Sequence, residues 1–240
     1  MQIQLILLIY VTHFIVYLLV AFLDLVNSVK PHLLFLLGPF VDINNSIIQS
    51  GIIKINDQYV DYEELFQTFM QLIWTSLEVK ENNTTKVVIQ PSLRDATSLY
   101  PMPQPSFEDS LVFDKMKDGS SRMESISNPE IIEMNDISIA LLNADVIQEI
   151  TSRCVCKPEK SVMESNILAF QSLLEQRCLY PIYPPSPNHP IELNLFHKFK
   201  LPAIPNIILT SSALPAFIEV NIINFSLNKI KFPLFSANSP

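Results

Sequence analysis

The sequence predicts an α/β fold in which buried parallel strands are joined by helices. Two continuous apolar runs, Leu33–Leu37 and Lys86–Gln90, are typical of strands buried on both faces. A helical apolar period occupies the segment between them, from Asp61 to about Leu77. This strand–helix–strand order implies a crossover connection, and therefore parallel strands with the helix packed on their sheet.

The helix between the two strands has a clear amino-terminal signal. Asp61 and Glu64 have the spacing of a capping box, in which the Asp61 side chain accepts from the helix backbone. We expect Asn82–Thr85 to form the turn before the second strand. The side expected to face the sheet carries Leu65, Phe69, Leu72 and Ile73.

The second half of the chain predicts further strands and two more helices. Asn135-Asp136 is a plausible two-residue hairpin turn between strands at Glu130–Met134 and Ile137–Asn143. Ile207–Thr210 and Phe217–Val220 are short apolar strand candidates. We expect Asp109–Arg122, which is polar and mixed in charge, to be a surface insertion.

Helix signals in this half follow the hairpin. Asp145 is a candidate cap for a short helix that continues through Ile150. A longer helix is predicted from Ser161 to about Arg177. Its expected inward residues are Ile167, Phe170, Leu173 and Leu174.

Composition excludes several function classes. The chain of 240 residues contains only three glycines, Gly38, Gly51 and Gly119, and none lies close to another. A Walker loop or a dinucleotide-binding loop needs closely spaced glycines to bring backbone N–H groups to phosphate. The net charge of −8 makes a broad nucleic-acid footprint unexpected, because phosphate binding needs clustered positive charge.

The amino terminus allows two interpretations. Leu5–Leu23 is almost wholly apolar, and as a helix it would span about 30 Å, the thickness of a bilayer core. It could therefore be a transmembrane or signal-anchor helix. No Lys or Arg precedes it, however, and it continues without a polar break toward Pro31. The alternative is a buried helix preceded by extra apolar residues.

Two acidic residues follow the ends of the buried strands and are the first candidates for metal binding. Asp42 lies in Gly38-Pro39-Phe40-Val41-Asp42, and Asp95 lies in Pro91-Ser92-Leu93-Arg94-Asp95. Metal-binding carboxylates of α/β proteins occupy such loops. A two-metal phosphoesterase needs additional histidine ligands, and the sequence has no His-x-His. We therefore expect Asp42 and Asp95 to be structural, with Asp95 paired to Arg94 or to a backbone N–H.

The sequence offers few other candidate metal ligands. Cys154 and Cys156 could offer two thiolates to zinc, but a structural site needs four ligands and Cys178 is the only other cysteine. The histidines are His13, His32, His189 and His197, and they are scattered. We assign no catalytic, cofactor-binding or metal-binding residue.

Several motifs in a fixed order resemble a known family. They are Leu33–Asp42 (LLFLLGPFVD), Val87–Phe107 (VVIQPSLRDATSLYPMPQPSF), Leu141–Ile147 (LLNADVI), Leu174–Pro187 (LEQRCLYPIYPPSP) and Leu201–Val220 (LPAIPNIILTSSALPAFIEV). Together they resemble the B subunits of DNA polymerase alpha, which are non-catalytic subunits of the polymerase alpha–primase complex. The resemblance covers roughly residues 21–220.

The resemblance implies a fold and a role. The fold would be a calcineurin-like (metallophosphoesterase) sheet sandwich flanked by helices, with a degenerate site. Active relatives have Gly-Asp-x-x-Asp where this chain has Pro39, and Gly-Asn-His-Asp/Glu where it has Ser92, Leu93 and Arg94. Leu93 cannot bind a metal, and Arg94 would repel one. The implied protein is a scaffold that binds the carboxy-terminal domain of the catalytic subunit, supports primase in initiating DNA replication, contacts DNA mainly indirectly, and is nuclear.

The resemblance also sets the expected domain limits. Residues 21–220 would form a partial phosphoesterase-like domain, incomplete at both ends. Residues 1–20 would be an unmatched apolar segment, either membrane-like or an artefact of the gene model, and residues 221–240 an unmatched tail. Two other functions remain open: an active metal-dependent phosphoesterase, and a membrane-anchored protein that uses residues 5–23.

Overall fold

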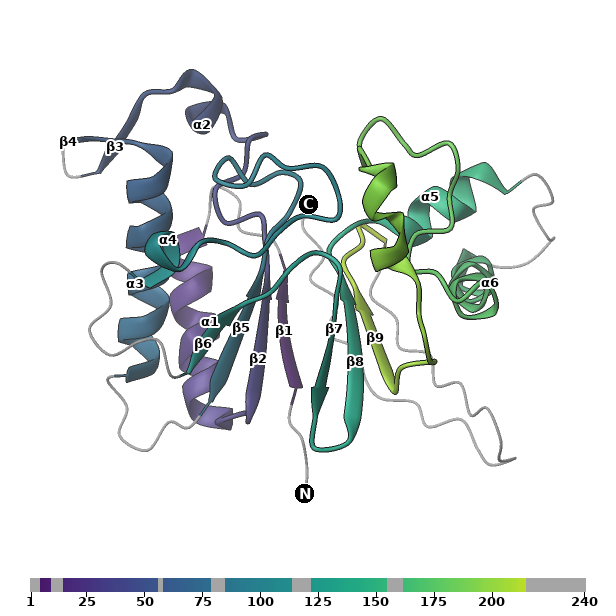
Figure 1. The fold of residues 1–240 in the computed structure, drawn as a ribbon. Helices are drawn as coiled ribbons and strands as arrows, with labels where there is room; N and C mark the ends of the chain where they lie inside the picture. Colours follow the sequence, from purple (N-terminus) through teal and green to yellow (C-terminus); the bar gives the residue numbers. More distant parts are fainter. Residues whose placement is uncertain are drawn as a thin grey trace.

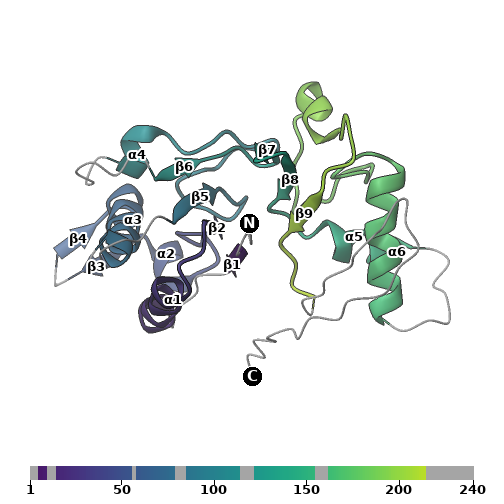
Figure 2. The same cartoon turned by 90° about the horizontal axis from the view of Figure 1, so that it is seen from below.

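Two β-sheets lie face to face at the centre of the protein, and helices cover their outer faces (Figure 1). The structure is a computed structural model, and it describes residues 5–9, 15–55, 58–78, 85–113, 122–154 and 162–214. Seen from below, the order of layers is helix, sheet, sheet, helix (Figure 2). The mixed α/β class predicted from the sequence is confirmed.

The first sheet contains four parallel strands in the order β1-β2-β5-β6. Leu33 lies opposite Lys86, and Leu37 lies opposite Gln90, so the predicted parallel pairing is confirmed. The helix between β2 and β5 packs on this sheet, as a crossover connection requires. The strands are β1 (Leu5–Ile9), β2 (Leu33–Leu37), β5 (Lys86–Gln90) and β6 (Met123–Ser125).

The two faces of β2 explain why its sequence is continuously apolar. Leu34 and Leu36 pack against the helices, whereas Leu33, Phe35 and Leu37 pack toward the second sheet. Successive side chains of a strand point to opposite faces, and here both faces are buried.

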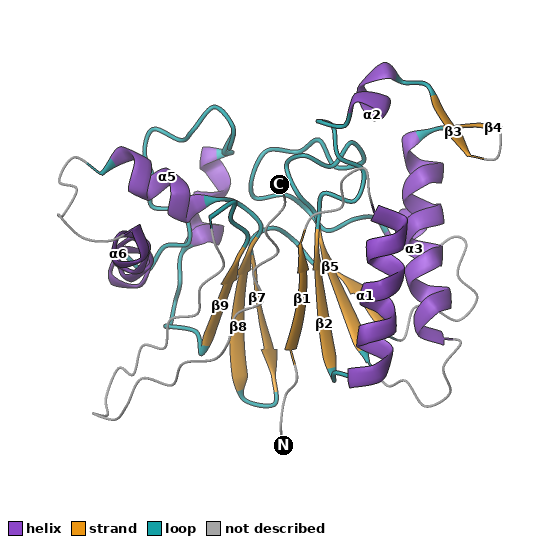
Figure 3. Cartoon of the chain, turned by 180° about the vertical axis from the view of Figure 1, so that it is seen from behind, coloured by secondary structure: helices purple, strands orange, loops and turns teal. Residues whose placement is uncertain are grey.

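Helices cover the outer face of the first sheet, on the side opposite the second sheet (Figure 3). An additional short hairpin, β3–β4, lies in the connection before α3. The elements of this half are α1 (Ile15–Val29), α2 (Ser46–Ser50), β3 (Ile53–Ile55), β4 (Gln58–Val60), α3 (Tyr62–Glu78) and α4 (Asp109–Phe113).

The start of α3 follows the prediction, and of its predicted inward residues Ile73 is fully buried while the other three pack at the edge of the core. The Asp61 side chain accepts from the Glu64 N–H at 2.7 Å, so the cap is confirmed. Leu65, Phe69 and Leu72 are only half-buried at the edges of the interface. The fully buried stripe is Phe66, Met70, Ile73 and Leu77, with the spacing of one helix face.

The amino-terminal apolar run is not one helix. Residues 5–9 form β1, which pairs in register with β2, and α1 begins only at Ile15. Leu23 and Val26 on α1 belong to the core against the first sheet. The prediction of a single helix over Leu5–Leu23 was therefore wrong. The backbone hydrogen-bonding groups of residues 5–9 pair with β2 instead of within a helix. Among the described residues, none of the helices has the length and apolarity needed to cross a membrane.

The second sheet has the order β7-β8-β9, with β7 antiparallel and β9 parallel to β8. Asn135 and Asp136 both have positive φ, 49° and 64°, and they form the predicted hairpin turn. Asp145 caps the next helix by accepting from the Gln148 N–H. The strands are β7 (Glu130–Met134), β8 (Ile137–Leu142) and β9 (Ile207–Thr210).

Helices α5 and α6 cover the outer face of the second sheet (Figure 1). Helix α5 spans Val146–Arg153 and α6 spans Val162–Glu175, followed by the 3₁₀ helix Leu193–Phe199. Of the predicted inward residues of α6, Leu173 is fully buried, whereas Ile167, Phe170 and Leu174 are half-buried. Ala169 and Asn166 take the remaining buried positions.

Some predictions fall outside the described residues. They are most of the turn at Asn82–Thr85, the strand at Phe217–Val220, the tail 221–240, His13 and Cys156. The predicted insertion Asp109–Arg122 is described at its ends. Helix α4 forms the beginning of this segment. At its end, the Arg122 guanidinium carbon lies 4.8 Å from the centroid of the Trp74 ring.

Candidate functional site

The loops that follow β2, β5 and β8 meet at one end of the two sheets, at the top in Figure 1. These loops contain Asp42, Asp95 and Asn143, and all three side chains are buried. Parallel strands place their carboxyl-terminal loops together, and this is where α/β proteins form sites. We refer to this group of loops as the strand-end centre.

Asp95 holds the first two loops together. Its side chain is fully buried and accepts from the backbone N–H groups of Phe40 (2.5 Å), Val41 (3.0 Å) and Ser92 (2.9 Å). Burial raises the pKa of this carboxyl to about 7, although the three backbone hydrogen bonds act in the opposite direction. Asp95 is therefore a structural clamp between the loop after β2 and the loop after β5.

Gly38 is required where these loops approach each other most closely. A Cβ atom built on Gly38 would lie 2.2 Å from the Asp95 Oδ2 atom and 3.1 Å from the Ser92 nitrogen. No side chain fits at that distance without moving the clamp.

Asp42 forms an ion pair with Arg94. The Arg94 Nε atom donates to Asp42 Oδ1 at 3.1 Å, and the Arg94 Nη2 atom contacts Asp42 Oδ2. The Asn44 N–H also donates to Asp42 Oδ1. A two-point guanidinium–carboxylate contact is strong and directional. Of the two predicted partners of Asp95, the backbone N–H is confirmed, whereas Arg94 binds the other carboxylate.

Asn143 connects the second sheet to the first, and sequence reasoning missed it. Its Nδ2 atom donates to the carbonyls of Gly38 (3.0 Å) and Pro91 (3.1 Å), which follow β2 and β5. Its Oδ1 atom accepts from Ser211 Oγ at 2.8 Å, after β9. One buried amide at the end of β8 thus contacts the segments that follow three other strands, and the only sequence signal was a polar residue directly after an apolar strand.

Two further amides complete the network. Asn128 accepts from the Asn143 N–H at 2.9 Å and donates to Gln104 Oε1 at 3.0 Å. Gln104 in turn donates to the carbonyls of Ser92 (3.1 Å) and Ser98 (3.0 Å) in the long loop after β5. Buried polar groups need such partners, because an unsatisfied one is costly.

The chemistry available at the strand-end centre is therefore mostly hydrogen bonding within the protein. Leu93 offers no ligand atom, and Pro39 lacks even a backbone N–H. Among the described residues, no three His, Cys, Asp or Glu side chains gather in a way that would hold a metal ion. Of the described cysteines, Cys154 is exposed and Cys178 is buried.

A second polar cluster lies away from this centre, where the proline-rich segment Tyr180–Pro190 meets α5. The Tyr180 hydroxyl donates to Glu149 Oε2 at 2.6 Å, and His189 Nδ1 lies 2.5 Å from Glu149 Oε1. Burial alone would raise the pKa of Glu149, but the Tyr180 hydrogen bond and the His189 charge lower it. Burial raises the pKa of Tyr180, and the Glu149 hydrogen bond adds to this. The cluster anchors the proline-rich segment to the helix.

Comparison with known proteins shows similarity over most of the chain. The model of a family described as the B subunits of DNA polymerases alpha and epsilon matches residues 8–219, so the match begins in β1 rather than at residue 21. The chain is 26% identical over 202 residues to the B subunit of DNA polymerase alpha from Bos taurus, covering 83% of this chain and 31% of that protein. It is 28% identical over 174 residues to the Saccharomyces cerevisiae protein of the same name, covering 70% of this chain and 24% of the relative.

A third similar protein comes from another organism. The B subunit of DNA polymerase alpha from Dictyostelium discoideum is 26% identical over 194 residues, which cover 80% of this chain and 27% of that protein. The chain thus spans between about a quarter and a third of the length of the curated relatives it matches.

Proposed function

The chain belongs to the family of B subunits of DNA polymerases alpha and epsilon, and we propose that it is a non-catalytic accessory subunit of the DNA polymerase alpha–primase complex. In this role it binds the carboxy-terminal domain of the catalytic subunit and supports the initiation of DNA replication together with primase. It acts in the nucleus, and its contacts with DNA are mainly made through its partners. The net charge of −8 agrees with a scaffold of this kind.

The observation that carries the proposal is the way the strand-end centre is filled. The Asp95 carboxylate accepts hydrogen bonds from three backbone N–H groups, and the Arg94 guanidinium binds Asp42. A divalent cation at Asp42 would have to displace a positive charge already in contact with it. The residues of this centre therefore favour loop anchoring over hydrolysis.

We further propose that the fold is calcineurin-like, with a degenerate phosphoesterase site. Two face-to-face sheets with helices outside, and functional loops at the strand ends, support this assignment. The domain proposed from the motifs covers residues 21–220. Because β1 pairs with β2 and the family match starts at residue 8, we extend the proposed domain to include β1.

Co-purification tests the accessory role. The full chain is co-expressed with the tagged carboxy-terminal domain of the polymerase alpha catalytic subunit, and the corresponding domain of the polymerase epsilon catalytic subunit is the control. We expect a stable one-to-one complex with the alpha domain and no retention by the epsilon domain. Failure to bind the full-length alpha catalytic subunit would contradict the proposal.

A hydrolysis assay tests the degenerate site separately. We expect no manganese- or zinc-dependent cleavage of bis-p-nitrophenyl phosphate above the level of a buffer blank. Activity that persists through purification and disappears in Asp42→Ala would instead establish a metallophosphoesterase.

A further inference from the structure

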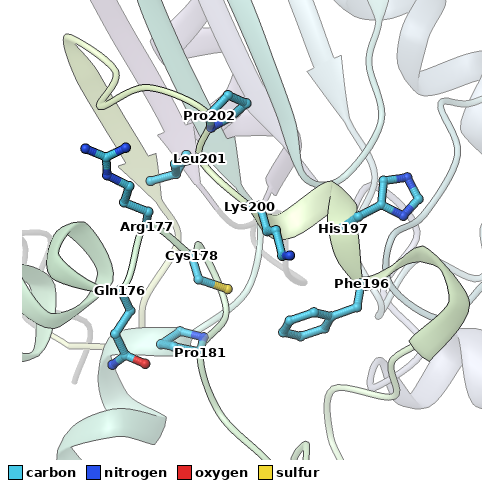
Figure 4. A pocket seen from close by; sticks show the side chains of 9 residues that line it. All are labelled: Gln176, Arg177, Cys178, Pro181, Phe196, His197, Lys200, Leu201 and Pro202. Atoms are coloured by element: carbon cyan, nitrogen blue, oxygen red, sulfur yellow. The ribbon is translucent and has the colours of Figure 1, made fainter.

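A hollow of about 710 Å³ lies where the end of α6 meets the 3₁₀ helix Leu193–Phe199, away from the strand-end centre. Figure 4 shows Cys178, Pro181 and Phe196 turned toward its middle, with the Lys200 ammonium group beside them. Arg177 and His197 extend outward on opposite sides of the same hollow (Figure 4). The hollow thus has an apolar middle and basic groups around it.

The walls of the hollow are fixed by backbone hydrogen bonds. The Leu179 N–H donates to the Phe199 carbonyl at 2.8 Å, and the Leu201 N–H donates to the Arg177 carbonyl at 2.9 Å. The two segments therefore run antiparallel, with Cys178 opposite Lys200. A site held in this way loses little conformational freedom when a ligand binds.

Arg177 has a backbone conformation that normally favours glycine. Its φ is +47°, and it stands at the position after the end of α6 where a left-handed residue closes the helix. The Arg177 N–H donates to the Leu174 carbonyl and the Cys178 N–H donates to the Leu173 carbonyl, each at 3.1 Å. Glycine at this position would make the folded state more stable, because a Cβ atom strains this conformation. The residue that adopts this strained conformation is an arginine, and its guanidinium group lies beside the hollow.

The charge around the hollow contrasts with that of the whole chain. The chain carries −8, yet this hollow is lined by Arg177, Lys200 and a histidine, His197. Within the described part of the chain, the side chains of Arg177 and Lys200 form no ion pair. Exposed cations without carboxylate partners attract an acidic ligand.

We propose that this hollow binds an acidic peptide segment of a partner protein. A large apolar side chain of the segment packs on Phe196, Cys178 and Pro181, and flanking carboxylates reach Lys200 and Arg177. A free phosphate would leave the apolar middle unmatched. Nucleic acid needs a broad cluster of positive charge, whereas the basic residues of this hollow are only Arg177, Lys200 and His197.

Fluorescence anisotropy of a labelled peptide tests this proposal. The probe is a fluorescein-labelled hexapeptide in which two acidic residues flank each side of a Leu-Phe pair, and the protein is the full chain. We expect saturable binding that Lys200→Glu weakens by at least about tenfold. The control is Lys198→Glu, an equal charge change on an exposed residue two positions away, which lies in the 3₁₀ helix but does not line the hollow. It should weaken binding less than about twofold.

Arg177→Gly gives a second readout that misfolding cannot imitate. Removing the strained side chain should raise the urea midpoint of unfolding while it weakens peptide binding. The proposal is overturned if the peptide does not bind saturably, or if Lys198→Glu and Lys200→Glu have equal effects. It is also overturned if an oligothymidylate binds through the same side chains more tightly than the peptide. The assay contains neither the catalytic subunit nor primase, so its failure leaves the proposed accessory role standing.

Discussion

Asp95 and Gly38 show how a single close contact determines the strand-end centre. The Asp95 carboxylate has no exposed surface and accepts three backbone N–H groups from two loops. It lies so near Gly38 that the absence of a Cβ atom is what lets the loops meet. The residue types at these two positions are therefore coupled.

We expect Asp95→Ala to lower the free energy of unfolding by about 3 kcal/mol or more. Each buried N–H left without a partner costs about 1–3 kcal/mol, and three would lose theirs. Urea unfolding followed by the fluorescence of Trp74, the only tryptophan, measures the change. The control is Asp61→Ala, which removes an exposed helix cap and should cost about 1 kcal/mol. Equal losses in the two variants would show that Asp95 is not a clamp.

The raised pKa of Asp95 predicts how stability depends on pH. Burial raises this pKa from 3.8 to about 7, so between these values the folded state binds more protons than the unfolded state. The free energy of unfolding should therefore fall as pH rises from about 4 to about 7, by at most about 1.4 kcal/mol per pH unit. In Asp95→Asn this contribution is removed, and the difference between the two pH curves isolates it. Parallel curves for the two proteins would contradict the prediction.

At the scale of elements, the hairpin between β7 and β8 shows a turn whose residues tolerate its geometry but are not the best for it. Asn135 and Asp136 both have positive φ, as the two central residues of a type I′ turn require. Asparagine is well suited to the first position, and glycine is preferred to aspartate at the second.

We expect Asp136→Gly to raise the free energy of unfolding by about 0.5–1 kcal/mol, because glycine adopts this conformation without strain. The comparison variant is Asp136→Val, which should destabilise the protein because a β-branched residue is strongly disfavoured at positive φ. Thermal unfolding of the two variants at one pH measures both effects. A stabilising Val variant would mean that the turn differs from the one described.

Local sequence signals predicted the elements whose own residues carry a recognisable pattern. The strands Leu33–Leu37 and Lys86–Gln90 and the Asn135-Asp136 turn needed only apolar runs and turn chemistry. For α3 the predicted inward residue Ile73 is fully buried, but the fully buried Phe66 was missed, because Leu65 and Phe66 are both apolar and only packing decides between them.

The strand-end centre could be located from the sequence, but its network could not. The loops that contain Asp42 and Asp95 were recognised because they follow buried strands. Asn143 donates to Gly38, which is 105 positions away along the chain, and no local pattern encodes such a contact. Likewise, β1 looked like part of a membrane helix because its partner strand lies elsewhere in the sequence.

At the scale of the whole molecule, two kinds of contact hold the sheets together. Apolar side chains fill the space between them, with Phe35 and Leu141 among those fully buried. At the strand ends, Asn143 adds directional hydrogen bonds from the second sheet to the first. Apolar packing is tolerant of small sliding, whereas an amide with fixed partners is not. We infer that Asn143 fixes how the two sheets are aligned.

Asn143→Ala should therefore destabilise the protein and loosen the alignment of the sheets. The substitution leaves the Gly38 and Pro91 carbonyls and the Ser211 hydroxyl without their buried partner. We expect a loss of about 2–4 kcal/mol, because the penalty for buried unsatisfied groups accumulates. The control is Asn206→Ala, since Asn206 accepts from Ser138 at an exposed position and should cost less than about 1 kcal/mol.

The same pair of variants distinguishes alignment from simple loss of stability. Hydrogen exchange followed by mass spectrometry should show faster exchange in the loops after β2, β5 and β8 of Asn143→Ala, while the middle of each sheet stays protected. In Asn206→Ala, any faster exchange should be confined to the neighbourhood of Ser138. If the strand-end loops of Asn143→Ala exchange no faster than those of the unmodified protein, packing between the sheets alone sets their alignment. The buried amide of Asn143 would then have no part in aligning the sheets.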